Sequence, residues 1–195
     1  MCAIILLNYL FMEDKMEKLD EIRKTLNFYV CSNELKNKII DEPNNYSVAD
    51  HLFGSMILAT AIDSEFKEAN NLSKIYRMLL LSEFSISYPN YDFENLKLGK
   101  QYTKEILESR DMNTENGKLV FKYKMLDLLL TKLIREKDNN ITPSELIKEG
   151  STIISLLCGK QPYECEEIFK FYYLNFRLKN KVRTGWDSKH WNVKS

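Results

Sequence analysis

The sequence predicts an all-α protein, and three observations carry that prediction. Only six glycines and four prolines interrupt the 195 residues. Apolar side chains recur at helical spacing, and no segment shows the sustained apolar/polar alternation of a half-buried strand. Helix-start signals are strong, above all Thr142-Pro143-Ser144-Glu145, which combines a capping threonine, a proline suited to the first helical position and a capping-box glutamate. We therefore expect helices joined by short turns.

The expected elements follow in order along the chain. The first helix covers about residues 13–40, either continuously or with a break, and Pro43-Asn44-Asn45 then forms a turn. Ser47 or Asn45 is suited to cap the next helix. Further helices are expected over residues 48–66, 72–86, 93–110, 118–137 and 142–159, and from Pro162 through the C-terminal segment. Tyr88-Pro89-Asn90 ends the helix over 72–86, because proline cannot continue it.

A long internal repeat indicates the domain organisation. Residues 28–40, FYVCSNELKNKII, recur as residues 171–183, FYYLNFRLKNKVR, at an offset of 143 residues (171 minus 28). That period is about the size of a small domain, far longer than a solenoid repeat. We therefore expect a helical domain over residues 1–159. Residues 160–195 would form a C-terminal helix and the opening of a second copy.

Composition limits the function classes. Lys+Arg and Asp+Glu both total 28, so a formal net charge of zero gives no electrostatic case for nucleic acid or an anionic membrane. The four cysteines form no CxxC pair, which is typical of reduced thiols in a cytoplasmic protein. The apolar start, residues 1–12, is shorter than the about 20 residues that span a bilayer. It is expected to pack on the core or, alternatively, to serve in dimerisation.

Three residues stand out as candidates for chemistry. His51 leans towards the apolar side of its helix, where it is either a hydrogen-bonded core residue or a ligand. Asp127 interrupts the run Met125–Leu130, so its carboxylate must be paired, metal-bound or turned outward. Its expected partners are Tyr123, Lys124 and Thr131. Glu83 follows a long apolar run, where it is a ligand or the point at which the helix meets solvent.

A family resemblance connects these residues. Residues 45–54, NYSVADHLFG, resemble the E-S-V-A-E-H segment of HD-domain metal-dependent phosphohydrolases, most closely the branch containing 5′-deoxynucleotidases. The resemblance covers about residues 28–137. In that family an R-T-G-W motif precedes the first histidine, and Arg183-Thr184-Gly185-Trp186 is similar to it. The resemblance implies an HD-domain-like helical bundle followed by the start of a second copy.

The same resemblance implies where a metal site would lie. The family's ligands follow the pattern H…HD…D, and His51 matches the first histidine. Ser82 and Glu83 fall on the His-Asp pair. The ungapped fit places Leu126 on the last aspartate, with Asp127 one residue later, a turn of about 100° on a helix. The family's acid after the His-Asp pair appears here as Ser85. Residues 40–43, IDEP, replace the first R-T-G-W motif.

These departures predict that catalysis has been lost. We expect an HD-like module that acts as a scaffold or regulator and needs no cofactor. The alternative is a metal-dependent phosphohydrolase acting on nucleotides. His51, Glu83 and Asp127 would then hold Mn, Co, Ni or Fe, and Arg183 and Trp186, from this chain or a partner, would bind phosphate. The expected partner is a second copy, bound through the aromatic-rich C-terminal helix. No nucleic acid and no membrane are expected.

Overall fold

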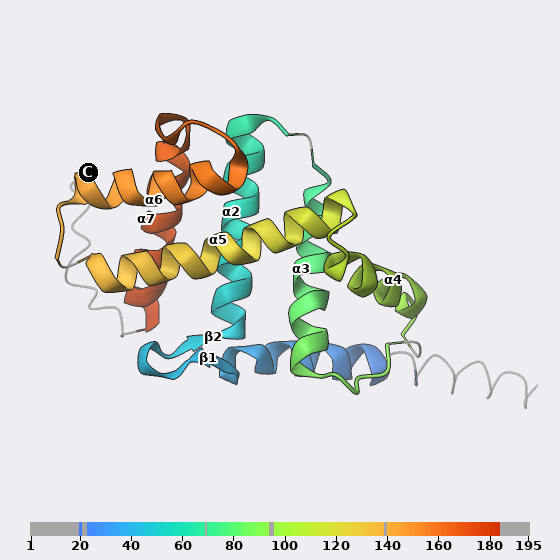
Figure 1. The fold of residues 1–195 in the computed structure, drawn as a ribbon. Helices are drawn as coiled ribbons and strands as arrows, with labels where there is room; N and C mark the ends of the chain where they lie inside the picture. Colours follow the sequence, from blue (N-terminus) through green and yellow to red (C-terminus); the bar gives the residue numbers. More distant parts are fainter. Residues whose placement is uncertain (1–19, 21–22, 69, 94–95, 139, 184–195) are drawn as a thin grey trace, which may run out of the picture. The chain divides into compact units, whose positions relative to one another are not determined.

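The structure, a computed structural model, describes residues 20, 23–68, 70–93, 96–138 and 140–183. These residues are mostly helical, which confirms the all-α prediction (Figure 1). A helix covers residues 23–33. The longer helices after it are α2 (Val48–Phe66), α3 (Leu72–Ser87), α4 (Gly99–Arg110), α5 (Glu115–Lys137), α6 (Pro143–Cys158) and α7 (Glu166–Arg183). Among the described residues, no helix is both long and apolar enough to cross a bilayer.

The predicted helix over residues 13–40 is wrong at its C-terminal end. The α-helix stops at residue 33 and is followed by a 3₁₀ helix, Glu34–Asn37. Strand β1 (Ile39–Asp41) then pairs antiparallel with β2 (Tyr46–Ser47). The β-branched pair at positions 39 and 40 favours extended backbone, and Pro43 lacks the N–H that a continuing helix needs. Strands this short show no alternation that sequence inspection could detect.

The predicted helix signals are otherwise largely confirmed. Ser47 caps α2: its hydroxyl accepts from the Asp50 N–H at 3.2 Å, and the Asp50 carboxylate accepts from the Ser47 N–H at 3.0 Å. Thr142 forms the predicted capping box with Glu145 at the start of α6. Gly159 ends that helix with a φ of 64°, a left-handed conformation that glycine adopts without strain. Helix α4 starts at Gly99, six residues later than predicted.

Internal contacts divide the chain into two compact units. The first contains the described residues up to Asp50 together with Arg77–Lys118, and the second contains His51–Tyr76 and the described residues from Leu119 onward. The predicted domain boundary at residues 159 and 160 stays a prediction. Each unit has its own core.

The core of the first unit is aromatic. Leu81, Phe84, Phe93 and Ile106 form its buried centre. Phe28, from the helix over residues 23–33, packs against this centre with its ring centroid 4.9 Å from that of Phe84. The N-terminal helix is therefore fastened to α3 by ring contacts.

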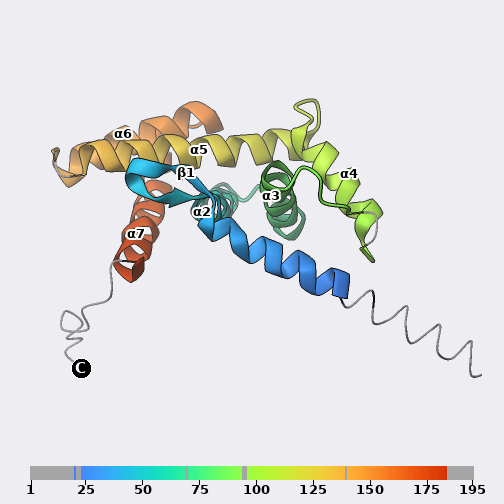
Figure 2. The same ribbon diagram turned by 90° about the horizontal axis from the view of Figure 1, so that it is seen from below.

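The second unit has two layers of helices. Helix α5 crosses both α2 and α7, and α6 lies beside α5 in both views (Figures 1 and 2). Phe169 of α7 is fully buried, and a Cβ at Gly150 of α6 would lie 2.1 Å from its ring. A residue without a side chain is therefore required where α6 and α7 approach. The crossing of α5 over α2 and α7 positions the candidate site.

Candidate functional site

Two of the three predicted site residues meet in the core of the second unit. His51, in the first turn of α2, places its Nδ1 2.6 Å from Oδ2 of Asp127, in the middle of α5. The two side chains are only 3% and 0% exposed. The one-residue offset in the family fit therefore does not keep Asp127 from His51. Leu126, the residue on the family's aspartate position, is itself fully buried.

A residue that the sequence analysis did not select completes the arrangement. The Tyr172 hydroxyl of α7 donates to Oδ1 of Asp127 at 2.6 Å, and it lies 2.9 Å from Oγ1 of Thr131. The tyrosine is 2% exposed. One carboxylate oxygen of Asp127 is thus hydrogen-bonded to the histidine of α2, and the other to the tyrosine of α7. This polar cluster of His51, Asp127, Tyr172 and Thr131 joins α2, α5 and α7.

The chemistry of the groups fixes the direction of the hydrogen bonds. An ionised carboxylate only accepts, so His51 donates from Nδ1 and Tyr172 donates from its hydroxyl. A tyrosine hydroxyl has a single proton, so Thr131 donates to Tyr172. Thr131 thus donates to Tyr172, Tyr172 donates to Asp127, and His51 donates to the other oxygen of Asp127. Hydrogen bonds to a charged acceptor are stronger than those between neutral groups.

Gly54 makes the close approach of Asp127 to α2 possible. A Cβ built at Gly54 would lie 1.8 Å from Oδ1 of Asp127 and 2.7 Å from its Cγ. Any larger residue would occupy the space that the carboxylate fills. The glycine, one turn after His51, therefore lets α5 and α2 share a buried carboxylate. Ser55, beside it, donates its hydroxyl to the His51 carbonyl at 2.8 Å.

The third predicted site residue belongs to the other unit. Glu83 lies on α3 in the first unit and is 6% exposed. Its neighbour Ser82 is also buried, and the Ser82 carbonyl accepts from the Ser85 hydroxyl at 2.9 Å. Nη2 of Arg110, on α4, donates to that same Ser85 hydroxyl at 2.7 Å. The guanidinium of Arg110 therefore contacts Ser85, the residue that stands where the family has an acid, and the sequence pattern did not indicate this contact.

The residues of the second unit do not by themselves fit a catalytic metal. Such a site needs about three protein ligands and an open position for water or substrate. The polar cluster offers one imidazole and one carboxylate, and these are bound to each other. Across the described residues, no group of three or more His, Cys, Asp or Glu side chains is arranged to hold an ion.

The two phosphate-binding residues predicted from the family are at or beyond the C-terminal limit of the described residues. Arg183 is the last residue of α7, and Trp186 lies outside the described residues. The apolar start, residues 1–12, also lies outside them. These predictions stay predictions.

Another predicted partner of Asp127 lies elsewhere in the core. Tyr123 is completely buried, and its hydroxyl has no hydrogen-bond partner among the described residues. Burial raises the pKa of this phenol, with the Glu68 and Asp63 carboxylates adding to the effect. Tyr123 is therefore a neutral core residue. Tyr172, 45 residues after Asp127 in the chain, is the tyrosine that reaches Asp127.

No protein-family model, curated protein or solved structure matches this chain.

Proposed function

We propose that this chain is an HD-domain-like helical module without catalytic activity, which acts as a scaffold or regulatory module. The observation that supports this most is the contact between the His51 ring and the Asp127 carboxylate. Two side chains expected to be metal ligands are hydrogen-bonded to each other in a closed core. Their role there is to hold helices together.

The burial of the cluster adds to this argument. A metal would have to replace the proton between His51 and Asp127, and the carboxylate would have to loosen its bond to Tyr172. Each hydrogen bond to a charged group contributes about 1.5–3 kcal/mol. A catalytic metal also keeps a position open for its substrate. Exposed fractions of 3% for His51, 0% for Asp127 and 2% for Tyr172 leave a phosphate ester little access.

One observation favours the alternative, a metal-dependent phosphohydrolase acting on nucleotides. The contact that closes the core also brings an imidazole within 2.6 Å of a carboxylate, and these are two of the three protein ligands that the alternative requires. In that alternative, His51 and Asp127 exchange their mutual hydrogen bond for bonds to the ion.

Metal analysis of the purified full chain separates the two functions. We expect no stoichiometric Mn, Co, Ni or Fe by elemental analysis, and no chelator-sensitive release of phosphate from deoxynucleotides. About one ion per chain that is lost in His51→Ala would contradict the proposal and establish the alternative. His190→Ala is the matched control, because His190 is the other histidine of the chain. If His51→Ala and His190→Ala lower the bound metal equally, the ion is not held specifically at His51.

A further inference from the structure

Helix α7 has two apolar faces, and only one of them is covered. Phe169, Tyr172 and Phe176 are 0%, 2% and 8% exposed and pack within the second unit. Phe171 and Leu174 are 46% and 57% exposed. These two residues define the outer face of α7. An exposed aromatic ring next to an exposed leucine is the usual composition of an interaction surface.

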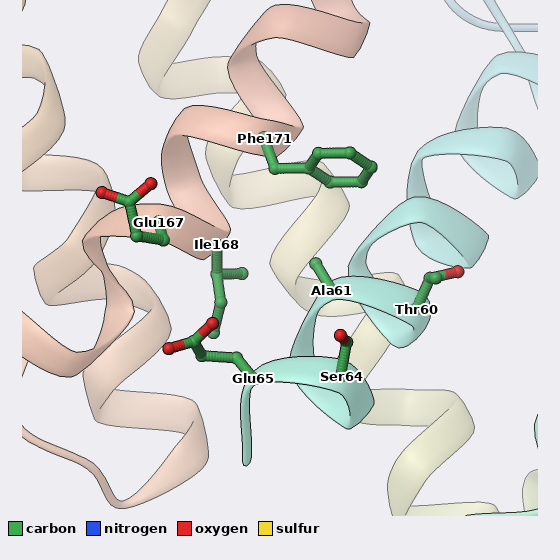
Figure 3. A pocket seen from close by; sticks show the side chains of 7 residues that line it. All are labelled: Thr60, Ala61, Ser64, Glu65, Glu167, Ile168 and Phe171. Carbon is green, nitrogen blue, oxygen red and sulfur yellow. The ribbon is translucent and has the colours of Figure 1, made fainter. Parts of the chain in front are cut away.

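A groove between α7 and α2 adjoins the outer face (Figure 3). It has a volume of about 300 Å³ and is lined by Thr60, Ala61, Ser64, Glu65, Glu167, Ile168 and Phe171. In Figure 3, the Phe171 ring extends from α7 towards α2, and the carboxylate of Glu65 lies near Ile168. The groove is therefore apolar beside Phe171 and acidic where α7 begins. An occupant with an apolar side chain and a neighbouring cation would match both parts.

The internal repeat shows what the outer face corresponds to. Phe171 aligns with Phe28, and Leu174 aligns with Cys31. In the first unit, Phe28 and Cys31 pack against the buried aromatic core. Tyr29, by contrast, is 65% exposed there, whereas its equivalent Tyr172 is buried. The two copies of the motif thus bury opposite faces. The face that the first copy packs against a helical core is the face that α7 leaves uncovered.

The charges along α7 indicate how this face would pair. The helix begins with Glu166 and Glu167, which pair with Lys170 of the same helix at 3.7 and 2.7 Å. Its sequence ends with four basic residues, Arg177, Lys179, Lys181 and Arg183. An antiparallel second α7 sets the acidic start of each helix beside the basic end of the other. A parallel arrangement would align like charges. Positions 167 and 181 are equally far from position 174 in the chain, so the centre of an antiparallel pair falls at Leu174.

From these observations we infer that the outer face of α7 binds a second copy of this chain, with the two α7 helices antiparallel about a two-fold axis near Leu174. The groove beside Phe171 receives the C-terminal half of the partner's α7. The basic sequence of that half then lies along the acidic start of the first helix. The interface is isologous, so it closes as a dimer and does not extend into a filament. This inference is independent of the metal question and of catalysis.

Sedimentation of the full chain over a range of concentrations tests the inference. We expect a monomer–dimer equilibrium. Phe171→Glu or Leu174→Glu should raise the dissociation constant at least about tenfold, because each places a charge in the apolar centre. Leu156→Glu, on α6, is the matched control: Leu156 is 79% exposed, and the same change should leave the equilibrium unaltered. Added salt should weaken the dimer, because the ion pairs are screened.

Cross-linking tests the position of the axis. In a chain with Cys2, Cys31 and Cys158 changed to serine, Leu174→Cys should form an intermolecular disulfide under mild oxidation, because a residue at a two-fold axis meets its own copy. Leu156→Cys should not. The inference is overturned if the chain stays monomeric at about 100 µM. It is overturned equally if the Leu156→Glu control weakens the dimer as much as Leu174→Glu does, or if Leu156→Cys is the variant that cross-links.

Discussion

Replacing Gly54 with alanine tests the buried polar cluster with the smallest possible change. Alanine at an ordinary helical position stabilises by about 1 kcal/mol relative to glycine. At Gly54 the added methyl group would lie 1.8 Å from the Asp127 carboxylate oxygen, well inside contact distance. Either α2 moves away from α5, or the carboxylate turns and loses its bonds to His51 and Tyr172. The sign of the effect should therefore be opposite to that of helix propensity.

The magnitude follows from the contacts. Overpacking a closed core costs about 1–3 kcal/mol, and loosening a hydrogen bond to a buried charge costs about 1.5–3 kcal/mol. After the propensity gain of about 1 kcal/mol, we expect Gly54→Ala to lower the free energy of unfolding by about 1.5–5 kcal/mol. That is a large fraction of the about 5–15 kcal/mol that stabilises a typical domain.

Urea unfolding followed by circular dichroism measures the change in the free energy of unfolding. Repeating the Gly54→Ala change in a chain that already carries Asp127→Ala makes the test specific for the carboxylate. In Asp127→Ala the carboxylate is gone, so the further change Gly54→Ala should be neutral or stabilising by up to about 1 kcal/mol. All four chains can be compared in one concentration of a stabilising osmolyte, which keeps the weaker variants folded. The argument is refuted if Gly54→Ala stabilises the parent chain. It is also refuted if the loss is as large without Asp127 as with it.

Three further effects can be checked with the same unfolding assay. Tyr172→Phe removes the hydroxyl that donates to Asp127 and should cost about 1–3 kcal/mol, whereas Tyr163→Phe, at a residue 74% exposed, should change stability by less than about 0.5 kcal/mol. Thr142→Ala removes the capping box of α6 and should cost about 1 kcal/mol; no loss would show that the cap contributes nothing. Burial raises the pKa of the Cys165 thiol from 9.0 to about 11, so its contribution to stability is complete below pH 9 and is lost as pH rises towards 11. The loss of stability over that alkaline range should be smaller in Cys165→Ala; an equal loss in both chains would exclude this thiol as a cause.

Sequence inspection was most successful where the signal is local. The capping box at Thr142 and the cap at Ser47 depend on side chains within three residues of the bonds they make, so spacing alone reveals them. The hairpin at residues 39–47 was missed because strands of two or three residues carry no periodicity. There, the β-branched pair Ile39-Ile40 before Pro43 was the available signal.

The polar cluster shows the limit of such inspection. A buried carboxylate was recognisable at Asp127, because an acid within an apolar run needs a partner. The identity of that partner depends on the crossing of α5 over α2 and α7. This crossing brings Asp127 to His51, 76 positions away in the chain, and to Tyr172, 45 positions away. Gly54 offered one overlooked signal: a glycine within an apolar helix, one turn from the histidine, marks a close approach.

Nitrogen NMR of the His51 ring tests the central claim most directly, because the chain has only two histidines and His190→Gln leaves a single ring signal. The account predicts that Nδ1 of His51 carries a proton that is shifted downfield by its bond to Asp127 and is slow to exchange. That signal should be unchanged by one equivalent of Mn²⁺ and altered in Asp127→Asn. Loss of the His51 signal at one equivalent of Mn²⁺, with recovery on adding a chelator, would contradict the account and show that the ring is a metal ligand.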